Sequence, residues 1–340
     1  MINRLPMVTL IQTNDVAVFQ TFAVADEASI VSHNSIDNHI DADIAKQQMQ
    51  QVGQASYGAL NLGLHVNDDA TKVLDNRMRL LAAFNRQLTS ESSQSKSQAS
   101  VHSLHWVNQV HGDQVYDVDA TTLSMAPMSA DAIVSEQRGR GLAIMTADCV
   151  PIVLYQPATG KIAAIHAGWQ GLACGVIKKT VERFIESGDI QAWIGVCISQ
   201  ASYEVGRPVL DKLYQGCTDN QSLITSDRHD FEHRYVTRSD DTAATYDDKS
   251  LHTANGQKQS DQSGQFDKSH SQQTAIAQTD KVRLNLPRLA ADQLSHAGVT
   301  VDNELAIDCS YADSRYYSYR RQTHLQQPAT GRMALVIVRR

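Results

Sequence analysis

The sequence predicts a mixed α/β domain in which helices bury a sheet. Short apolar runs of strand length alternate along the chain with segments whose apolar residues recur at helical spacing. The chain has 340 residues, of which 42% are hydrophobic, so it can build a substantial core. No internal repeat is visible. We therefore expect a single domain over residues 1–340, although the pattern does not give the order of the strands.

The first half of the chain supplies one helix and then a strand-rich region. A helix is predicted over Val73–Leu88, since these positions share one helical face: Val73, Arg77, Leu80, Leu81, Phe84 and Leu88. The run Gly141–Tyr155 is largely apolar and predicts buried strand. Lys161–His166 is the neighbouring strand, because it follows a turn marked by Pro157 and Gly160.

The second half continues the alternation. Leu172–Glu186 has an apolar face at helical spacing and ends at Gly188, so it predicts a helix, and Gln191–Ser199 predicts a buried strand. Pro287–His296 predicts another helix, with proline near its start and Gly298 just after its end. Two further strands are expected at Glu304–Cys309 and Met333–Val338.

Two polar stretches predict loop insertions on this domain. The first is Thr89–Ser100, which reads TSESSQSKSQAS, and the second is Thr237–Asp280, where apolar residues are sparse. Segments of this composition cannot bury enough surface to offset the entropy of ordering them. We expect 89–100 to be flexible and 237–280 to be low-complexity and disordered. Ser32–Gln54 is also polar and is expected to be a loop.

Charge and cysteine content narrow the class of protein. The net charge of −7 argues against general nucleic-acid binding and against an anionic membrane surface, although a local arginine cluster can still bind a small anion. No apolar run reaches the roughly 18 residues of a membrane span, and the N-terminus lacks a secretory pattern. Five cysteines without regular spacing indicate a reducing compartment. We expect a soluble cytoplasmic protein.

Three soft ligands lie where predicted strands meet loops. His111 lies in WVNQVHG, Cys149 in MTADCVP and His166 in AAIHAGWQG, each within a few residues of glycine or proline. Two imidazoles and one thiolate form a suitable zinc set, and three protein ligands leave a position for a water whose pKa falls toward about 7.

The residues alone leave other interpretations of this trio open. The spacings of 38 and 17 residues match no compact zinc motif. Cys149 is equally a candidate nucleophile that His166 or His111 activates. Each histidine taken singly is most often an ordinary core or surface residue.

Nine ordered segments resemble a known family: YGALNLGLHVNDD, VLDNRMRLL, LHWVNQVHGDQV, SADAIVS, GLAIMTADCVPIVLY, AAIHAGWQGLACGVIKKTV, WIGVCISQASYEVG, YYSYRRQ and TGRMALVIV. Together they resemble the laccase-domain family, also called multicopper polyphenol oxidase-like, purine nucleoside phosphorylase-like or peptidoglycan editing factor. The resemblance covers most of the chain outside the two inserts and the N-terminal segment. TADC-P and HAGW-G are its most specific motifs.

The resemblance implies that His111, Cys149 and His166 coordinate one zinc ion within a single-domain mixed-sheet α/β sandwich. It implies an enzyme that phosphorolyses adenosine, inosine or methylthioadenosine and also deaminates adenosine. The expected partners are a nucleoside and phosphate, in a monomer or small homo-oligomer. Copper is less expected, because polyphenol oxidation needs several copper sites and the chain shows one good cluster.

Further candidates surround the trio. Asp148 precedes the cysteine and is either a turn carboxylate or a catalytic group that supports a ligand or moves a proton. It would point away from Cys149 along a regular strand unless the chain turns there. Gln109 is expected to face the same pocket as His111. Asn61, with His65 nearby, is a candidate for bonding a base or ribose, or else a turn residue.

Arginines are the candidates for phosphate, because a planar guanidinium suits it. Arg320 is the expected ligand. Arg320 and Arg321 would point to opposite faces if they lay on a strand, and for Arg321 and Arg332 the common alternative is a solvated charge. Arg77 lies on an otherwise apolar helical face, so we expect it to be partly buried and paired, and it is also a candidate for binding substrate.

The sequence departs from the family pattern in three places. The region FQTFAVADEASIVSHNS lacks the usual arginine and paired glycines, which puts contacts from that region to substrate in doubt. Gln170 replaces the arginine between Trp169 and Gly171, and Asn285 replaces a usual aspartate. None of these departures removes an expected metal ligand.

Two alternative functions remain. One is a cytoplasmic amidase that removes a wrongly incorporated serine from a muramoyl peptide precursor, by zinc or by a Cys149 nucleophile. The other is a non-catalytic metal-binding or partner-binding protein. A fourth ligand, such as Cys174 or His105, would favour the latter, because closed structural zinc sites have four protein ligands.

Overall fold

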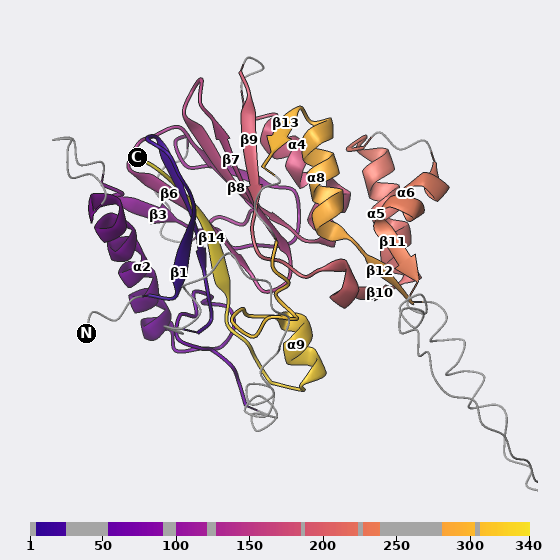
Figure 1. Ribbon diagram of the computed structural model, residues 1–340, viewed down its shortest axis with the longest axis horizontal. Coiled ribbons are helices and arrows are strands. Elements are labelled where there is room, and N and C mark those ends of the chain that lie inside the picture. Colours follow the sequence, from indigo (N-terminus) through magenta and orange to yellow (C-terminus); the bar gives the residue numbers. More distant parts are fainter. Residues whose placement is uncertain are drawn as a thin grey trace, which may run out of the picture.

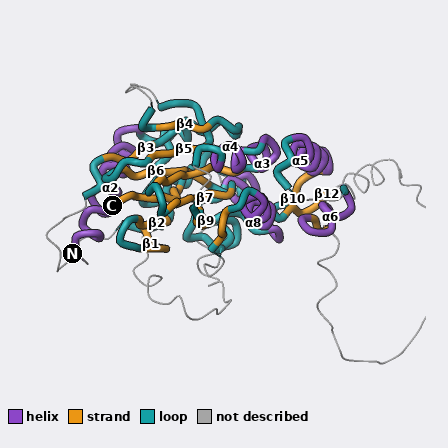
Figure 2. Tube along the Cα trace, turned by 90° about the horizontal axis from the view of Figure 1, so that it is seen from above, coloured by secondary structure: helices purple, strands orange, loops and turns teal. Residues whose placement is uncertain are grey.

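The computed structural model describes residues 5–24, 54–90, 100–120, 127–184, 188–223, 227–238, 281–302 and 307–340 (Figure 1). Within these ranges two large sheets pack against each other and helices cover both outer faces. Figure 2 shows α2 on one side of the strands and α4, α5 and α8 on the other. The predicted mixed α/β fold is confirmed. None of the described helices is long and apolar enough to cross a membrane.

The first sheet has five strands in the order β1-β2-β14-β6-β3, with β3 parallel to β6 and the other neighbours antiparallel. Helix α2 covers its outer face. The bounds are β1 Met7–Gln12, β2 Val16–Thr21, β3 Ser103–His105, β6 Arg140–Thr146, β14 Met333–Arg339 and α2 Ala70–Ser90.

The second sheet has six strands in the order β13-β9-β7-β8-β5-β4. Its outer face packs against four helices. The strands are β4 Val115–Asp117, β5 Ala132–Ser135, β7 Val150–Gln156, β8 Lys161–Ala167, β9 Ile190–Ile194 and β13 Val299–Val301. The helices are α3 Trp169–Cys174, α4 Val176–Val181, α5 Arg207–Asp219 and α8 Leu286–His296.

Strands that are buried on both faces divide their side chains between two cores. In β14 (MALVIVR), Leu335 and Ile337 face the second sheet, whereas Val336 and its alternate neighbours pack beneath α2. In β7, Val153 faces the first sheet and Ile152 faces the helices. Because neighbouring residues in a strand point to opposite faces, near-continuous apolar runs are what this layering requires.

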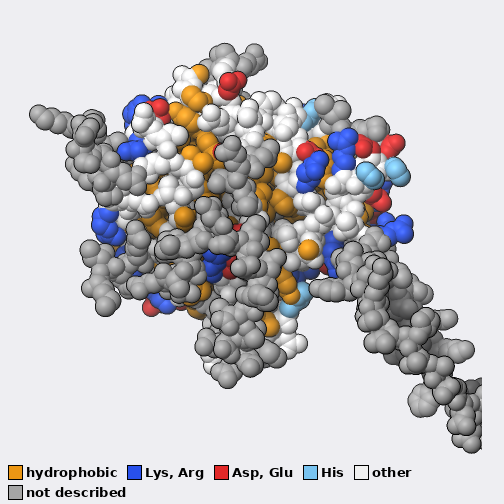
Figure 3. Space-filling model, viewed as in Figure 1, with side chains coloured by type: hydrophobic (Ala, Val, Ile, Leu, Met, Phe, Trp, Pro, Cys, Tyr) orange, Lys and Arg blue, Asp and Glu red, His pale blue; other side chains and the backbone are white. Residues whose placement is uncertain are grey.

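A small antiparallel sheet, in the order β10-β12-β11, lies beside the larger ones with α5 and α6. Its bounds are β10 Glu204–Gly206, β11 Val236–Arg238, β12 Lys281–Leu284, α6 Arg228–Tyr235 and the preceding 3-10 turn Gln200–Ser202. The remaining described helix, α9, spans Tyr319–His324. Figure 3 shows basic, acidic and histidine side chains side by side over α5 and α6, where Arg228 pairs with Asp211 and Glu232.

Four predicted elements are confirmed within a residue or a few: the helices at 73–88 and 287–296 and the strands at 161–166 and 333–338. The strand predicted over 191–199 ends at Ile194. The apolar run 141–155 is two strands in different sheets, because the chain turns at 147–149.

Two predictions about elements were wrong in part. The helix predicted over 172–186 is two short helices, because Gly175 adopts a left-handed φ of 80° between α3 and α4. No strand occupies 307–309, where Cys309 makes a single bridge to Cys197, and the strand of this region is β13. Residues 303–306 lie outside the described ranges.

The predicted insertions fall mostly outside the described residues, at 91–99 and 239–280, as does most of the expected loop at 32–54. The described margins of the insertions are structured. Helix α2 continues to Ser90, and Thr237 and Arg238 belong to β11.

Candidate metal centre

The second sheet brings the three candidate ligands together. Strands β7 and β8 are antiparallel, and their register pairs Val150 with Ala167, so Cys149 at the start of β7 meets His166 at the end of β8. His111 comes from the loop between β3 and β4. The expectation that thiol and imidazole lie at one end of neighbouring strands is therefore confirmed.

The ligand atoms of these residues all lie within 4.8 Å of one another. His111 Nε2 is 3.8 Å from Cys149 Sγ, and the two imidazole rings are nearly perpendicular, with centroids 4.7 Å apart. A tetrahedral zinc ion would separate a nitrogen and a sulfur ligand by about 3.6 Å, as follows from the usual bond lengths. The donor set and its spacing thus fit a metal ion. No fourth histidine, cysteine or carboxylate of the described residues joins the group, so neither Cys174 nor His105 completes it.

Asp131 holds two of the ligands in place. Its side chain is fully buried and accepts His166 Nδ1–H at 2.8 Å, which turns His166 Nε2 toward the cluster. The same carboxylate accepts three consecutive backbone N–H groups of the loop, from Val110, His111 and Gly112, at 3.2, 2.9 and 2.7 Å. A carboxylate behind a ligating histidine fixes its tautomer and orientation.

Cys149 and His166 form a coupled charged pair. Burial alone would raise the pKa of the thiol, but His166 and His111 outweigh it, so the Cys149 pKa lies below its usual range. Burial would likewise lower the pKa of His166, but Cys149 and Asp131 outweigh it and raise that pKa. A thiolate is the protonation state that binds metals.

Two residues of the site have left-handed backbones that non-glycine residues rarely adopt. The φ angle is 62° at His111 and 111° at Asp148. Such strain persists where the surrounding contacts over-determine it, and it concentrates at functional sites. Here the turn at Asp148 directs Cys149 toward the histidines.

Asp148 points away from the cluster. It is buried, and Oδ1 accepts the Ser310 hydroxyl at 2.7 Å while Oδ2 accepts the backbone N–H of Arg320 at 2.7 Å. Burial raises its pKa, although these donors oppose the shift. The carboxylate therefore joins the start of β7 to the C-terminal segment.

One side of the cluster is open. His111 is exposed, Cys149 is partly exposed and His166 is buried. Gly168 borders the site so closely that a Cβ there would lie 3.0 Å from Cys149 Sγ and 3.2 Å from His111 Cδ2. A ligand can therefore approach from the His111 side.

Two predicted substrate residues use their amides internally. The Gln109 side chain donates from Nε2 to Met145 O at 2.7 Å and accepts Met145 N–H at Oε1 at 2.9 Å, and so extends the hydrogen bonding of β6. The Asn61 side-chain oxygen accepts the N–H groups of Gly63 and Arg332, and its nitrogen donates to Asp68 at 2.9 Å. These contacts give both residues a structural role, and a contact to substrate stays a prediction for each.

The arginine predictions change once the fold is known. Arg320 and Arg321 lie on helix α9 rather than on a strand, so the argument from opposite faces was wrong. Arg320 donates to Glu204 O at 2.7 Å and lies over the Tyr203 ring. Arg321 donates to four backbone carbonyls, including those of Ser310 and Tyr311, so its guanidinium is committed to the local fold.

The charges of Arg77 and Arg332 both act on His65. Arg77 donates to Leu62 O at 2.7 and 3.0 Å and stacks 4.2 Å from the Trp106 centroid, and burial lowers its pKa to about 10. Burial lowers the pKa of Arg332, and the nearby charge of Cys149 opposes that shift. Burial also lowers the pKa of His65, and the charges of both arginines and of His111 and His166 add to the effect.

The arginines around the site are not neutralised by described carboxylates. No ion pair among the described residues involves Arg77, Arg320 or Arg332, whereas arginines elsewhere, such as Arg140 and Arg315, have carboxylate partners. Arg77, Arg320 and Arg332 therefore bring positive charge that no described ion pair uses, alongside the carboxylates of Asp131 and Asp148 at the cluster.

Sequence reasoning missed Asp131, which contributes the most hydrogen bonds to the cluster. The only available signal was its place in SADAIVS, just before a strand. The structure explains one departure from the family pattern, the asparagine at position 285. Its side chain caps α8 by accepting Arg288 N–H at 3.0 Å, as an aspartate would.

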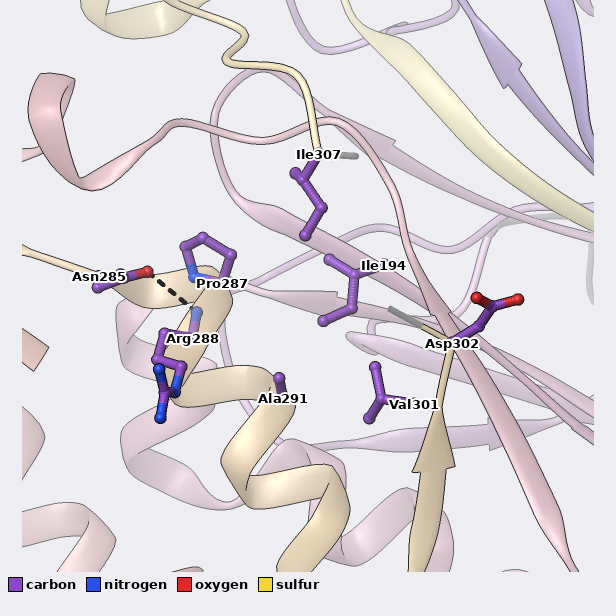
Figure 4. Close-up of a pocket in the computed structure, with 8 residues that line it drawn as sticks. All are labelled: Ile194, Asn285, Pro287, Arg288, Ala291, Val301, Asp302 and Ile307. Atoms are coloured by element: carbon purple, nitrogen blue, oxygen red, sulfur yellow. Dashed lines mark hydrogen bonds between the residues drawn. The ribbon is translucent and has the colours of Figure 1, made fainter. Parts of the chain in front are cut away.

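A separate hollow of about 350 Å³ lies between α8 and the edge of the second sheet (Figure 4). Ile194, Val301 and Ile307 point toward one another there, and Pro287 and Ala291 of α8 face them. None of the candidate metal ligands lines this hollow, so its shape says nothing about the cluster.

The amino-acid sequence matches a family model and several proteins of known name. The model of the family described as multi-copper polyphenol oxidoreductase laccase matches residues 44–240 and 250–340. The protein named purine nucleoside phosphorylase YfiH of Escherichia coli K12 is 39% identical over 154 residues, which cover 45% of this chain and 57% of that protein. Purine nucleoside phosphorylase PA4543 of Pseudomonas aeruginosa is 37% identical over 161 residues, covering 47% and 58%. The matches thus span little more than half the length of these relatives.

Solved structures share the fold. The Neisseria meningitidis protein NMB0706 superposes with a TM-score of 0.61 at 24% identity and covers 98% of this chain and 99% of its own. YlmD from Geobacillus stearothermophilus has a TM-score of 0.58 at 22% identity, with coverage of 96% and 92%. At these identities the likeness extends to the fold alone.

Proposed function

Because the chain belongs to the multi-copper polyphenol oxidoreductase laccase family, in which curated relatives are named purine nucleoside phosphorylases, we propose that it is a zinc-dependent purine nucleoside phosphorylase. Its expected substrates are adenosine, inosine or methylthioadenosine, together with phosphate. One observation carries the proposal: the charge of Cys149 in the open three-ligand site acts on Arg332, which forms no ion pair with a described carboxylate.

The metal would be held by His111, Cys149 and His166. A thiolate with two imidazoles is a set that suits zinc, and three protein ligands leave a position for substrate or water. Zinc bound there would act as a Lewis acid toward an oxygen or nitrogen of the substrate. Polyphenol oxidation would require several copper sites, and the described residues contain one such group.

For phosphate we add Arg332 to Arg320, which is the sequence-based candidate. The charge of Cys149 acts on Arg332, whose Nη1 donates to Thr330 O and Gly331 O. Arg320 Nη1 donates to Glu204 O, and its guanidinium lies over the Tyr203 ring. Arg77 and Arg332 both act on His65, whose lowered pKa favours its neutral form. Their role would be to orient phosphate toward C1′ of the ribose and to offset its charge.

Deamination of adenosine is the second reaction that this site would support, because three protein ligands leave a position on a metal for water. It requires addition of water at C6 and a group that moves protons. Asp148 does not face the cluster and both its oxygens accept hydrogen bonds, so we assign it a positioning role behind Cys149.

The test combines metal analysis with product analysis. The purified protein and Cys149→Ser are assayed for bound zinc, then incubated with inosine and with adenosine, with and without phosphate. We expect near-stoichiometric zinc in the parent only, and phosphate-dependent release of hypoxanthine or adenine. Inosine formed from adenosine without phosphate would add the deaminase activity.

Arg332→Gln separates the phosphate role from the metal role. We expect an unchanged zinc content and a KM for phosphate at least tenfold higher, while Arg79→Gln, an exposed arginine of α2, leaves both unchanged. Bound zinc without purine turnover would overturn the phosphorylase and direct the search to the muramoyl amide. Turnover without zinc would leave Cys149 as a free nucleophile.

A further inference from the structure

Two cysteines outside the candidate metal centre lie opposite each other. Cys197 follows β9, Cys309 follows the 303–306 segment, and the two form an isolated parallel bridge in which Ser310 N donates to Cys197 O at 3.0 Å. Both are free thiols. Bridge partners direct their side chains to the same side at the inter-strand spacing of about 4.8 Å, which lies within the Cα separation of about 4.4–6.8 Å that a disulfide needs.

The two thiols have unequal surroundings. Cys309 is partly exposed, and its sulfur accepts the Ser199 N–H at 3.3 Å and contacts the Ser202 hydroxyl at 3.6 Å. Burial alone would raise the Cys309 pKa, but these donors outweigh it and lower that pKa. Cys197 is completely buried, and burial raises its pKa. A partly exposed thiol whose pKa is lowered, beside a second thiol, is the arrangement found in redox-sensing cysteines.

Cys197 and Cys309 also lie next to residues that bond to Asp148, the residue before the candidate ligand Cys149. Ile198, next to Cys197, donates its N–H to Asp148 O at 2.9 Å. Ser310, next to Cys309, donates its hydroxyl to Asp148 Oδ1 at 2.7 Å. Ile198 and Ser310 both bond to Asp148, and each is the next residue after one of the two cysteines. A disulfide between Cys197 and Cys309 would therefore link the two chain segments that hold Asp148.

We propose that Cys309 is a site of oxidation by hydrogen peroxide and that Cys197 resolves it as an intramolecular disulfide. The Cys309 thiolate attacks one peroxide oxygen, the O–O bond breaks, and the departing hydroxide takes up a proton to become water. The Cys197 sulfur then attacks the sulfenic sulfur, the S–O bond breaks, and a second water leaves. Two thiols lose two electrons and one peroxide gains them, and a dithiol reductant reverses the change.

The experiment uses the full-length, zinc-loaded protein and reads the covalent state rather than activity. After exposure to peroxide near stoichiometry, the protein is unfolded in an alkylating agent and its peptides are mapped by mass spectrometry. Of the five free thiols, we expect two to disappear into one linked peptide pair that contains positions 197 and 309, and dithiothreitol to restore both.

Variants identify the roles. Cys309→Ser should lose no thiol, and Cys197→Ser should stop at a sulfenic acid that dimedone traps at Cys309. Cys174→Ser, which removes an exposed cysteine of α3, should behave as the parent. A disulfide through Cys149, a link between two chains, or sulfinic acid at Cys309 with Cys197 still free would each overturn the proposal. If a variant fails to fold, the peptide map of the parent decides.

Discussion

Asp131 is the residue whose replacement tests how the candidate metal centre is held. Asp131→Asn keeps the size of the side chain but loses the charge and one acceptor oxygen. Either His166 Nδ1–H and His111 N–H or the two N–H groups of Val110 and Gly112 then lose their acceptor. Changes of this kind typically weaken metal binding by about 10–100-fold. We expect that loss in a competition titration with a chromogenic zinc chelator.

The control is Asp113→Asn, since Asp113 lies in the same loop but pairs with Lys179 at the surface. It should bind zinc as the parent does. Equal affinities for Asp131→Asn and the parent would show that the backbone alone positions His111 and His166.

The same carboxylate should make stability depend on pH. Burial opposes ionisation of Asp131, but His166 and the loop N–H groups outweigh it, so its folded pKa lies below the unfolded value of about 3.9. A lowered pKa contributes stability that is fully present above the unfolded value and is lost as pH falls through the folded one. In urea unfolding of metal-free protein, the stability difference between parent and Asp131→Asn should shrink as pH falls below about 4. A difference that grew in acid would contradict this assignment.

At the scale of elements, two glycines next to helices share the same backbone conformation and differ in their surroundings. Gly175, between α3 and α4, and Gly298, after α8, both have a φ of 80°. A Cβ at Gly298 would meet nothing within 4 Å, whereas one at Gly175 would lie 3.2 Å from the Asn220 amide, which donates to Ala173 O at 2.6 Å.

Alanine at either glycine should cost about 1–2 kcal/mol for the left-handed backbone. Gly175→Ala should cost roughly 1 kcal/mol more, because Asn220 must move and give up its hydrogen bond. Chemical unfolding of the two variants measures the difference. Equal losses would mean that Asn220 adapts without cost.

The sequence predicts an element well when the element depends on residues close together in the chain, and less well when it depends on contacts between distant segments. Periodicity located α2 and α8, whose apolar faces are intact. It could not divide the run 141–155 between two sheets, because strands buried on both faces read as continuous apolar sequence whichever sheet they join. It also could not show that Gly175 interrupts a helix, since glycine is tolerated within helices as well.

In the candidate site, too, the sequence located some residues and missed others. Strand ends and residue type, with the family resemblance, located His111, Cys149 and His166. The supporting residues depend on contacts between segments distant in sequence. Asp131 therefore went unnoticed, and the choice of Arg320 for phosphate stays a prediction, because no pattern tells which way a side chain on α9 points.

At the scale of the whole molecule, the insertion between β11 and β12 tests whether the fold is one domain that needs no more than its described parts. Arg238 pairs with Val282, so the strands that flank residues 239–280 are hydrogen-bonded neighbours. Replacing 239–280 by Asn-Gly would leave three residues between that pair, a common hairpin length.

We expect the shortened protein to have the zinc content and turnover of the parent, with an unfolding midpoint within a few degrees. Calorimetry and the product assay check this. Loss of soluble protein or of turnover would show that the insertion contributes to the domain.

The position of β14 has a consequence for how the protein is made. This strand lies between β2 and β6, yet the ribosome synthesises it long after both. Until it emerges, β2 and β6 each present an unpaired edge, and the inner layer of the sandwich lacks its central strand. Such edges invite pairing with other chains. The nascent chain therefore depends on chaperones or on rapid late closure, and any premature stop before β14 would produce an aggregation-prone fragment even though all three ligands of the candidate metal centre had already been translated.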